Sequence, residues 1–451
     1  MLSFPRTPDS LLVVFSCRVL IPVTTYPETL DYLFSLHRFG IKLGLESITD
    51  ILDRLDNPQR RYATLHVGGT NGKGSSSAMV ASILQANGYR VGLYTSPHLI
   101  DFRERIRVQG ADISEEAVCG LIEQIRRTAN PLTALTFFEF TTALAFLHFR
   151  NQHVDIAVVE VGMGGRFDAT NVLNPMGALI TGIGFDHEAY LGDSLQMIAQ
   201  EKAGIITQQV PVVLGPMPED LIRIFETQAR KWQAPCFRMG QEFSFLETSA
   251  TTFTYQGPRW TIPGLQTNLL GRHQMVNATN ALAVLETAVD GTFPISQAAI
   301  RTGLQDVRWR GRLEVVYRDP LMLVDGAHNL AGAHVLFDFL HSQIHDGGGR
   351  KLILVVGMMR DKNLQGFLRV FFPLVDRLIL TQPRMERAAS VDELKQAVDR
   401  EDVIPCLLAD SWEAVCRAKD IANPSDVICV TGSLFLVGEV LNRLTQLDFP
   451  T

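Results

Sequence analysis

The feature that most constrains the fold is a glycine-rich segment with a single lysine, residues 66–75 (HVGGTNGKGS). An apolar run of strand length, residues 62–67, precedes it, and a stretch with helical spacing of apolar residues, 76–86, follows it. Glycines let backbone N–H groups turn toward an anion, and a helix N-terminus adds partial positive charge. Lys73 would lie over the terminal phosphates of a nucleotide. The segment therefore predicts a phosphate-binding strand–turn–helix unit.

The segment departs from the general phosphate-loop pattern in two places. The pattern requires a glycine five residues before the final Gly-Lys pair, where this chain has Val67. It also requires serine or threonine directly after the lysine, whereas Gly74 intervenes here and Ser75 follows. The alternative is a turn that only reverses the chain. A lysine inside a strand–turn–helix frame favours phosphate binding over that alternative.

Several further apolar runs alternate with helical stretches and end in polar residues. The runs at 90–94, 155–159 and 178–183 are followed by Ser96, Glu160 and His187. Alternating strands and helices predict a doubly wound α/β sheet, in which ligands bind at the carboxyl ends of the strands. A hydroxyl, a carboxylate and an imidazole converging beside phosphates would suit Mg²⁺, although each alone could be a capping or core residue.

The chain is long enough for two or three domains, since it has 451 residues. Short β-like runs within 236–265 predict a small antiparallel insertion, and a second series of apolar strands begins near residue 305. We therefore expect an N-terminal extension at 1–25, a phosphate-loop-type sheet domain at 26–305 and a smaller Rossmann-like α/β domain at 306–451.

Composition narrows the functional classes. The net charge of −7 argues against a nucleic-acid surface, and no apolar run reaches the length needed to span a membrane. Residues 1–25 lack a convincing signal peptide. The six cysteines are scattered and form no CxxC pair, which favours reduced thiols in a cytoplasmic protein.

Two other segments carry chemically useful side chains. Lys202 lies on a predicted helix that leads away from His187, where a lysine alone is usually a solvated surface residue. In the second domain a strand ends in Asp325, turns, and presents His328. Asp325 could accept from a ribose hydroxyl and His328 could contact a phosphate, or the segment could be only a turn and helix cap. Arg312 adds a cation near the domain junction.

From about residue 26 to 440 the chain resembles the bacterial folylpolyglutamate synthase/dihydrofolate synthase family of the Mur ligase superfamily. The motifs that carry this resemblance are GTNGKGS at 69–75, TSPHL at 95–99, FRERI at 102–106, the segment 160–171, DH at 186–187, EKAGI at 201–205, DGAHN at 325–329, GM at 357–358 with DK at 361–362, and VTGSL at 430–434. Departures include Ser47, Gly182 and Arg310, which replace residues common in the family.

The resemblance implies a role for each matching residue. It implies ATP and Mg²⁺ as cofactors, a carbamylated lysine at Lys202, and catalytic roles for Lys73, Lys202 and His328. The implied ATP site comprises Thr70, Asn71, Gly72, Lys73, Gly74, Ser75, Asn277, Arg312, Asp325 and His328. The implied metal ligands are Ser96, Glu160, His187 and Lys202. The implied pterin-side pocket comprises Lys42, Leu43, Thr136, Phe137, Phe138, Glu139, Phe167, Asp168 and Ala169.

The expected activity is an ATP-dependent ligase that joins L-glutamate to dihydropteroate and to the glutamate tail of a reduced folate through an acyl phosphate. The family also suggests a monomer. One alternative is a ligase of the same superfamily that extends a nucleotide-linked cell-wall precursor, but only about 65 residues precede the phosphate loop, too few for the separate UDP-binding domain of those enzymes. A nucleotide-gated switch is a second alternative, disfavoured by Glu160, His187, Asp325 and His328.

Overall fold

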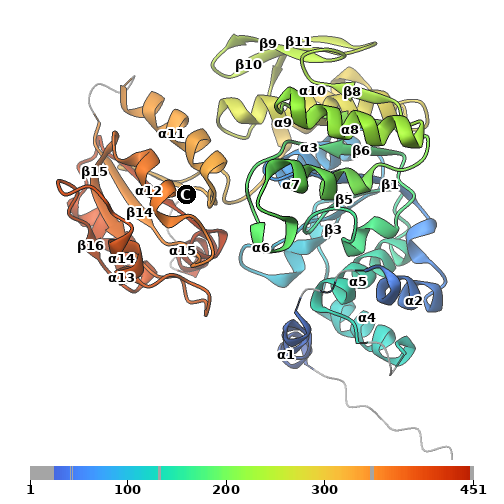
Figure 1. Cartoon of the computed structure of the whole chain (residues 1–451), viewed down its shortest axis with the longest axis horizontal. Helices are drawn as coiled ribbons and strands as arrows, with labels where there is room; N and C mark the ends of the chain where they lie inside the picture. The colour runs from blue at the N-terminus through green and yellow to red at the C-terminus, as the bar shows by residue number, and fades with distance from the viewer. Residues whose placement is uncertain (1–24, 41, 43, 131–133, 346–349, 447–451) are drawn as a thin grey trace, which may run out of the picture.

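The computed structural model describes residues 25–40, 42, 44–130, 134–345 and 350–446. Most of the predicted N-terminal extension, residues 1–24, and the predicted pocket residue Leu43 lie outside the described residues. Within the described part, two α/β sheet units lie side by side, joined by the segment after residue 306 (Figure 1). No helix in that part is long and apolar enough to cross a membrane.

The first unit is built on an eight-stranded sheet with the order β4-β3-β2-β5-β1-β6-β7-β8. Strands β2, β5, β1, β6, β7 and β8 run parallel, and β3 and β4 add an antiparallel edge. The strands are β1 (Ala63–Gly68), β2 (Val91–Tyr94), β3 (Ile106–Val108), β4 (Ala111–Asp112), β5 (Ile156–Glu160), β6 (Gly177–Ile180), β7 (Val212–Leu214) and β8 (Cys236–Arg238).

Helices cover both faces of this sheet because its central strands are apolar on both sides. Leu65 of β1 and Val158 of β5 pack with α3, α9 and α10, whereas Ala157 and Val159 of β5 pack with α4 and α5. Period-two alternation sends neighbouring side chains to opposite faces. The helices are α1 (Tyr26–Ser35), α2 (Glu46–Arg54), α3 (Lys73–Ala86), α4 (Glu115–Thr128), α5 (Phe137–Asn151), α6 (Glu188–Leu191), α7 (Leu195–Lys202), α8 (Glu219–Trp232), α9 (Arg272–Val284) and α10 (Gln297–Asp306).

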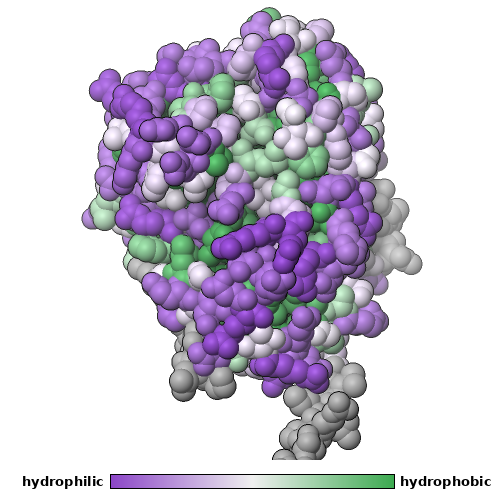
Figure 2. Space-filling model, turned by 90° about the vertical axis from the view of Figure 1, so that its right-hand side faces the viewer, coloured by the Kyte–Doolittle hydropathy of each residue, from purple (hydrophilic) through white to green (hydrophobic). Residues whose placement is uncertain are grey.

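The predicted antiparallel insertion is a three-stranded sheet of β9 (Ser244–Ser249), β10 (Thr252–Gln256) and β11 (Thr261–Gln266). It lies at one end of the first unit, and Phe253, Tyr255 and Ile262 join the core beneath it (Figure 1). The face of the first unit that points away from the second is largely hydrophilic, with apolar residues in scattered patches (Figure 2).

The second unit has a six-stranded sheet with the order β12-β13-β17-β14-β15-β16, parallel except at β12. Its strands are β12 (Glu314–Arg318), β13 (Leu321–Val324), β14 (Leu352–Val356), β15 (Val375–Leu380), β16 (Cys406–Leu407) and β17 (Val427–Thr431). Its helices are α11 (Leu330–His345), α12 (Leu364–Phe371), α13 (Val391–Gln396), α14 (Ser411–Ile421) and α15 (Leu434–Gln446). The mixed α/β class predicted for both units is confirmed; the domain limits near residue 305 stay a prediction.

Candidate active site

The glycine-rich segment forms a tight turn between β1 and α3. Gly69 has a φ of +134° and Gly72 a φ of +85°, conformations that favour glycine. A Cβ atom at Gly69 would lie 2.1 Å from Thr181 Oγ1, and one at Gly72 would lie 2.4 Å from Asn277 Oδ1. Both glycines are therefore required by close contacts, and Asn277 of α9 lies directly against the turn.

The turn is fastened to the loop that follows β6. The Thr70 backbone N–H donates to the Gly182 carbonyl at 2.8 Å, and the Gly184 N–H donates to Thr70 Oγ1 at 3.0 Å. Thr181 Oγ1 donates to the Asn71 carbonyl at 2.6 Å. These bonds fix the phosphate loop relative to the loop that carries His187.

The glycine after the lysine also has a packing reason. A Cβ atom at Gly74 would lie 2.8 Å from Cζ2 of Trp309, whose indole packs over the first turn of α3. The Arg107 guanidinium lies over the same indole, 5.6 Å from the Trp309 ring centroid. The departure of Gly74 from the general pattern therefore matches a tryptophan at the junction of the two units.

Two lysines converge on one carbonyl of the loop. Lys202 Nζ donates to the Gly69 carbonyl at 2.8 Å, and Lys73 Nζ donates to the same oxygen at 3.0 Å and to the Thr70 carbonyl at 3.0 Å. Lys202 is buried, and burial together with the charge of Lys73 lowers its pKa to about 7. Lys202 is thus not a solvated surface lysine, and a large fraction of it is a neutral amine near pH 7.

The three predicted metal ligands lie at the carboxyl ends of neighbouring strands. Ser96 follows β2, Glu160 ends β5, and His187 follows β6. The Ser96 backbone N–H donates to Glu160 Oε2 at 3.3 Å, and burial raises the pKa of Glu160. Desolvation lowers the pKa of His187 to about 4, so its imidazole is neutral and can offer a lone pair. Among the described residues, no group of three or more His, Cys, Asp or Glu side chains has a metal-binding arrangement.

Asp186, next to His187, connects the two units. Its carboxylate accepts from Lys362 Nζ at 2.7 Å and lies 3.4 Å from His328 Nε2, both in the second unit. Burial alone would raise the pKa of Asp186, but the His328 hydrogen bond and the charge of Lys362 hold it well below its usual range. Asp186 is therefore an anion that holds the second unit against the first.

A second polar contact between the units involves the phosphate loop itself. The side-chain amides of Asn71 and Asn329 donate to each other, with both N···O distances 3.1 Å. His328 Nδ1 donates to the Gly326 carbonyl at 2.8 Å, which leaves Nε2 facing Asp186. The Asp325 carboxylate accepts from the backbone N–H groups of Leu313 and Ala327 at 2.9 and 2.8 Å.

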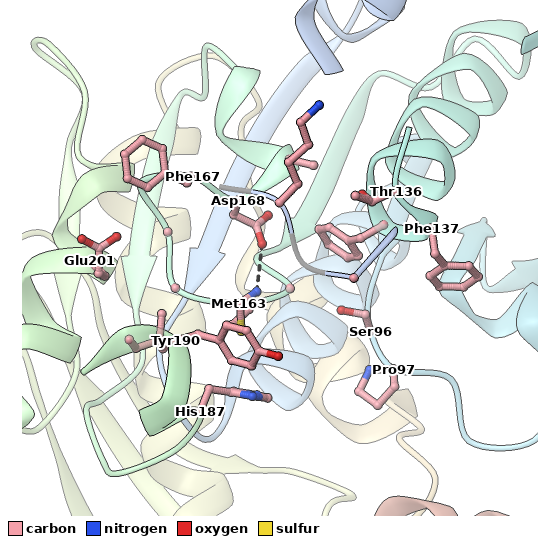
Figure 3. Close-up of a pocket in the computed structure, with 18 of the residues that line it drawn as sticks. Ser96, Pro97, Thr136, Phe137, Met163, Phe167, Asp168, His187, Tyr190 and Glu201 are labelled. Carbon is pink, nitrogen blue, oxygen red and sulfur yellow. Dashed lines mark hydrogen bonds between the residues drawn. The ribbon is translucent and has the colours of Figure 1, made fainter. Parts of the chain in front are cut away.

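Between the two units lies a cavity of about 590 Å³. Figure 3 shows residues from several loops around it, including Ser96, Thr136, Phe167 and His187. The predicted residues that line it are Lys42, Ser96, Thr136, Phe137, Phe138, Glu139, Phe167, Asp168, Ala169, His187 and His328. An adjoining cavity of about 20 Å³ is lined by Thr70, Lys73, His187 and Lys202 among others. Asn71, Gly72, Gly74, Ser75, Glu160, Asn277, Arg312 and Asp325 line neither, although Arg312 acts electrostatically on Glu160.

One wall of the large cavity is the N-terminus of α5. Thr136 caps this helix, and Glu139 Oε2 accepts from the Thr136 N–H at 2.8 Å, while the buried Oε1 has no partner among the described residues. The ring of Phe138 packs so closely on Gly162 that a Cβ atom there would lie 2.3 Å from it. Across the cavity, Lys42 Nζ donates to Ser47 Oγ at 2.6 Å, so a residue that departs from the family pattern positions Lys42.

An adjoining wall is the loop after β5, which Phe138 contacts at Gly162. Asp168 Oδ2 accepts from the Met163 N–H at 2.8 Å, the bond drawn in Figure 3, and Oδ1 accepts from the Thr170 N–H at 3.0 Å. Burial raises the pKa of Asp168. Phe167 is half exposed beside it and Ala169 is buried. The Asp168 carboxylate thus shapes the loop that forms this wall.

Sequence reasoning assigned no role to four residues that complete the site: Asp186, Lys362, Trp309 and Asn329. Asp186, Lys362 and Asn329 lie in the motifs that carry the family resemblance, and those motifs were the only sign in the sequence that these residues belong to the site. Their pairing across 176 and 258 positions leaves no trace in a single sequence. A fifth, Arg105, lines the cavity, donates to His98 Nδ1 at 2.8 Å and lies over the ring of Phe137.

Comparison with known proteins agrees with this geometry. Residues 67–285 match the Mur ligase middle domain, and residues 311–434 match the Mur ligase glutamate ligase domain. A dihydrofolate synthase/folylpolyglutamate synthase of Bacillus subtilis is 30% identical over 93% of this chain and 99% of its own length.

Solved structures give the same result. The bifunctional folylpolyglutamate synthase/dihydrofolate synthase of Yersinia pestis, complexed with AMPPNP and Mn ion, is 33% identical with a TM-score of 0.85, over 94% of this chain and 98% of that one. E. coli FolC in complex with DHPP and ADP is 30% identical with a TM-score of 0.86, over 94% and 99%. This chain therefore belongs to the dihydrofolate synthase/folylpolyglutamate synthase family of the Mur ligase superfamily.

Proposed function

We propose that this chain uses ATP to join L-glutamate to dihydropteroate and to the glutamate tail of tetrahydrofolate, through an acyl phosphate. One observation carries the proposal. The cavities beside the phosphate loop bring Lys73 and Lys202 next to His187, and His187 also lines the large cavity formed by α5, the loop after β5 and the second unit. A nucleotide, an acceptor carboxylate and an amine can therefore meet at one place.

The nucleotide would bind across the two units. Backbone N–H groups of residues 71–75 would face its phosphates at the N-terminus of α3, while the Thr70 N–H fastens the loop to Gly182. Asn277 already contacts the loop at Gly72, and Asn329 pairs with Asn71. Arg312 and Asp325 would complete the site from the second unit, with Asp325 also holding its own loop in shape.

The donor set fits a hard divalent cation once Lys202 is carbamylated. Ser96 and Glu160 supply oxygen, and His187 supplies a neutral nitrogen. A neutral amine is needed to react with CO₂, and the lowered pKa of Lys202 provides it near pH 7. The carbamate would add an oxygen ligand and bring a negative charge beside Lys73. When bound, Mg²⁺ would neutralise charge on the phosphates and orient the transferred phosphoryl group.

The pterin end of the acceptor would bind against α5. The free Oε1 of Glu139 can accept from ring N–H groups, because that buried oxygen has no partner among the described residues. Phe138 and Phe167 offer apolar surface on two walls, and Lys42 lies on a third. Thr136, Phe137, Asp168 and Ala169 would act mainly by holding these walls in place.

The reaction follows from this placement. The acceptor carboxylate oxygen attacks the γ-phosphorus of ATP and ADP leaves, while Lys73 stabilises charge on the transferring group. The neutral amine of L-glutamate then attacks the acyl carbon, the C–O bond to phosphate breaks, and the nitrogen, which becomes positively charged as the C–N bond forms, gives one proton to the released phosphate or to water. His328, which faces Asp186 at the unit boundary, would contact the phosphate. Apposition of the two units excludes water from the acyl phosphate.

A coupled assay tests the proposal. ATP-dependent phosphate release should require L-glutamate together with dihydropteroate or tetrahydrofolate, and Lys73→Ala should abolish it. Turnover near the wild-type level in Lys73→Ala, or activity only with a UDP-linked precursor, would refute the assignment. We also propose a cytoplasmic monomer, which size-exclusion chromatography with light scattering and cell fractionation would check.

A further inference from the structure

The large cavity is lined by an arginine that the mechanism above does not use. Arg387 lies in the turn between β15 and α13 of the second unit, and its backbone carbonyl accepts from the Arg360 N–H at 2.8 Å. The side chain is exposed, and no described carboxylate lies within 4.0 Å of it. A cation that lines a cavity without an anionic partner is available to a ligand.

The other cations of this cavity are already engaged. Lys362 binds Asp186 at 2.7 Å, Arg105 is buried and donates to His98, and Lys42 donates to Ser47. Lys362 also lies beside His328, close to the reaction centre. Among these four lining cations, Arg387 is therefore the one whose side chain makes neither a hydrogen bond nor an ion pair with another described residue.

Arg387 shares the cavity with an aromatic part of the first unit. His37 lines the same cavity and stacks on Phe137, with ring centroids 4.2 Å apart. Burial lowers the pKa of His37, and the charges of Arg105 and Arg387 lower it further. The His37 ring is thus neutral, and Arg387 lies within electrostatic reach of it.

The two proposed acceptors, dihydropteroate and tetrahydrofolate, differ by one anionic group between the reacting carboxylate and the aromatic end of the molecule. In both, the carboxylate to be phosphorylated must reach the same point beside Lys73 and His187. Each γ-linked glutamate adds five backbone bonds, about 6 Å, between that point and the aromatic end of the substrate. It also adds one α-carboxylate, which takes no part in the chemistry and must be solvated or paired. Dihydropteroate carries no such group.

We propose that Arg387 binds the α-carboxylate of a γ-glutamyl unit in the folate tail, and so selects glutamylated folates as acceptors. The proposal rests on the ligase function proposed above. A guanidinium suits this task because it is always charged and can bind a carboxylate through two parallel hydrogen bonds. Because Arg387 is exposed, the cavity beside it is open to solvent, so the aromatic end that each added glutamate displaces outward has room to move.

The test compares both reactions in one variant, Arg387→Gln. The KM for tetrahydrofolate monoglutamate and diglutamate should rise about tenfold, the loss of one exposed charge-assisted contact. The KM values for dihydropteroate, ATP and L-glutamate should stay within about twofold, as should kcat for dihydropteroate. Arg387→Lys should recover part of the loss, because it keeps the charge but not the bidentate geometry.

Arg384→Gln is the matched control. Arg384 lies on the same turn, is exposed and is paired with Asp410 at 2.8 Å, and does not line the cavity. An increase in KM for L-glutamate in both reactions would assign Arg387 to the incoming amino acid and overturn the proposal. Equal losses with both acceptors, or no change with either, would also overturn it. A wild-type protein inactive with both acceptors would instead refute the ligase function.

Discussion

Replacing Lys202 by methionine should stabilise the unmodified protein and abolish its activity. The pKa of Lys202 is about 7 in the fold, against about 10.4 in an unfolded chain. At pH 7 this difference corresponds to about 4 kcal/mol of lost stability. Methionine has a similar length and no charge to desolvate. It loses one hydrogen bond to the Gly69 carbonyl, worth about 1 kcal/mol, but that carbonyl keeps its bond from Lys73.

The expected net gain is about 3 kcal/mol near pH 7, and its pH dependence has a defined sign. Between pH 7 and about 10 the unfolded wild-type chain binds more protons than the folded one, so wild-type stability rises with pH. The methionine variant lacks this slope, and the difference between the two proteins should close toward pH 10. Urea unfolding in CO₂-free buffer at several pH values would measure it.

Measuring stability with and without bicarbonate separates the effect of the buried Lys202 charge from the effect of a carbamate on Lys202. A carbamate on Lys202 replaces a desolvated ammonium by an anion next to Lys73, so bicarbonate should stabilise the wild type and leave Lys202→Met unchanged. In Lys202→Ala, which leaves space, a small carboxylate such as acetate should restore part of the activity. Lys231→Met, on the exposed face of α8, is the control and should change stability little at any pH. A methionine variant that is less stable than wild type by the same amount at pH 7 and pH 10 would refute the reasoning.

Two further substitutions test the walls of the site. Gly74→Ala places a methyl group 2.8 Å from the Trp309 indole, so it should cost about 1–3 kcal/mol of stability and raise the KM for ATP, as measured by thermal unfolding and steady-state kinetics. Combining it with Trp309→Phe should recover part of both losses; strictly additive losses would contradict the contact. Glu139→Gln keeps an oxygen for the Thr136 N–H but replaces the free oxygen by a donor, so the KM for dihydropteroate should rise about 10- to 100-fold with unfolding unchanged. An unaltered KM would exclude Glu139 from pterin binding.

The sequence predicted the sheets well because a buried parallel strand must be apolar on both faces. The runs that became β1, β2, β5 and β6 are of this kind, and the polar residues that follow them mark the edge where the site lies. The edge hairpin of β3 and β4 was not predicted, since its strands have three and two residues and carry arginine and aspartate. Short edge strands show too little periodicity to be recognised.

Contacts between residues far apart in the chain could not be predicted from the sequence, for a different reason. A single lysine on a predicted helix, such as Lys202, is usually exposed to solvent, and only the fold shows that Lys202 is buried against the Gly69 carbonyl. Trp309 lies in the segment predicted to link the two domains, yet it packs on Gly74. The positions were visible in the sequence. Their partners depend on how two separate sheets are apposed, which no local pattern encodes.

Polar contacts that can exchange contribute to that apposition, beside the packing of Leu99 and Ile100 on the second unit. The amide pair of Asn71 with Asn329 and the ion pair of Asp186 with Lys362 both join a loop of the first sheet to a loop of the second. The amide pair contributes about 1 kcal/mol net and the ion pair about 1.5–3 kcal/mol, so the two together are weaker than one well-bound substrate. These two polar contacts help to align the phosphate loop with His328, and they cost little to break when the units separate. Separation is required chemically, because the cavity between them must admit a folate and an amino acid and release ADP, phosphate and a longer product.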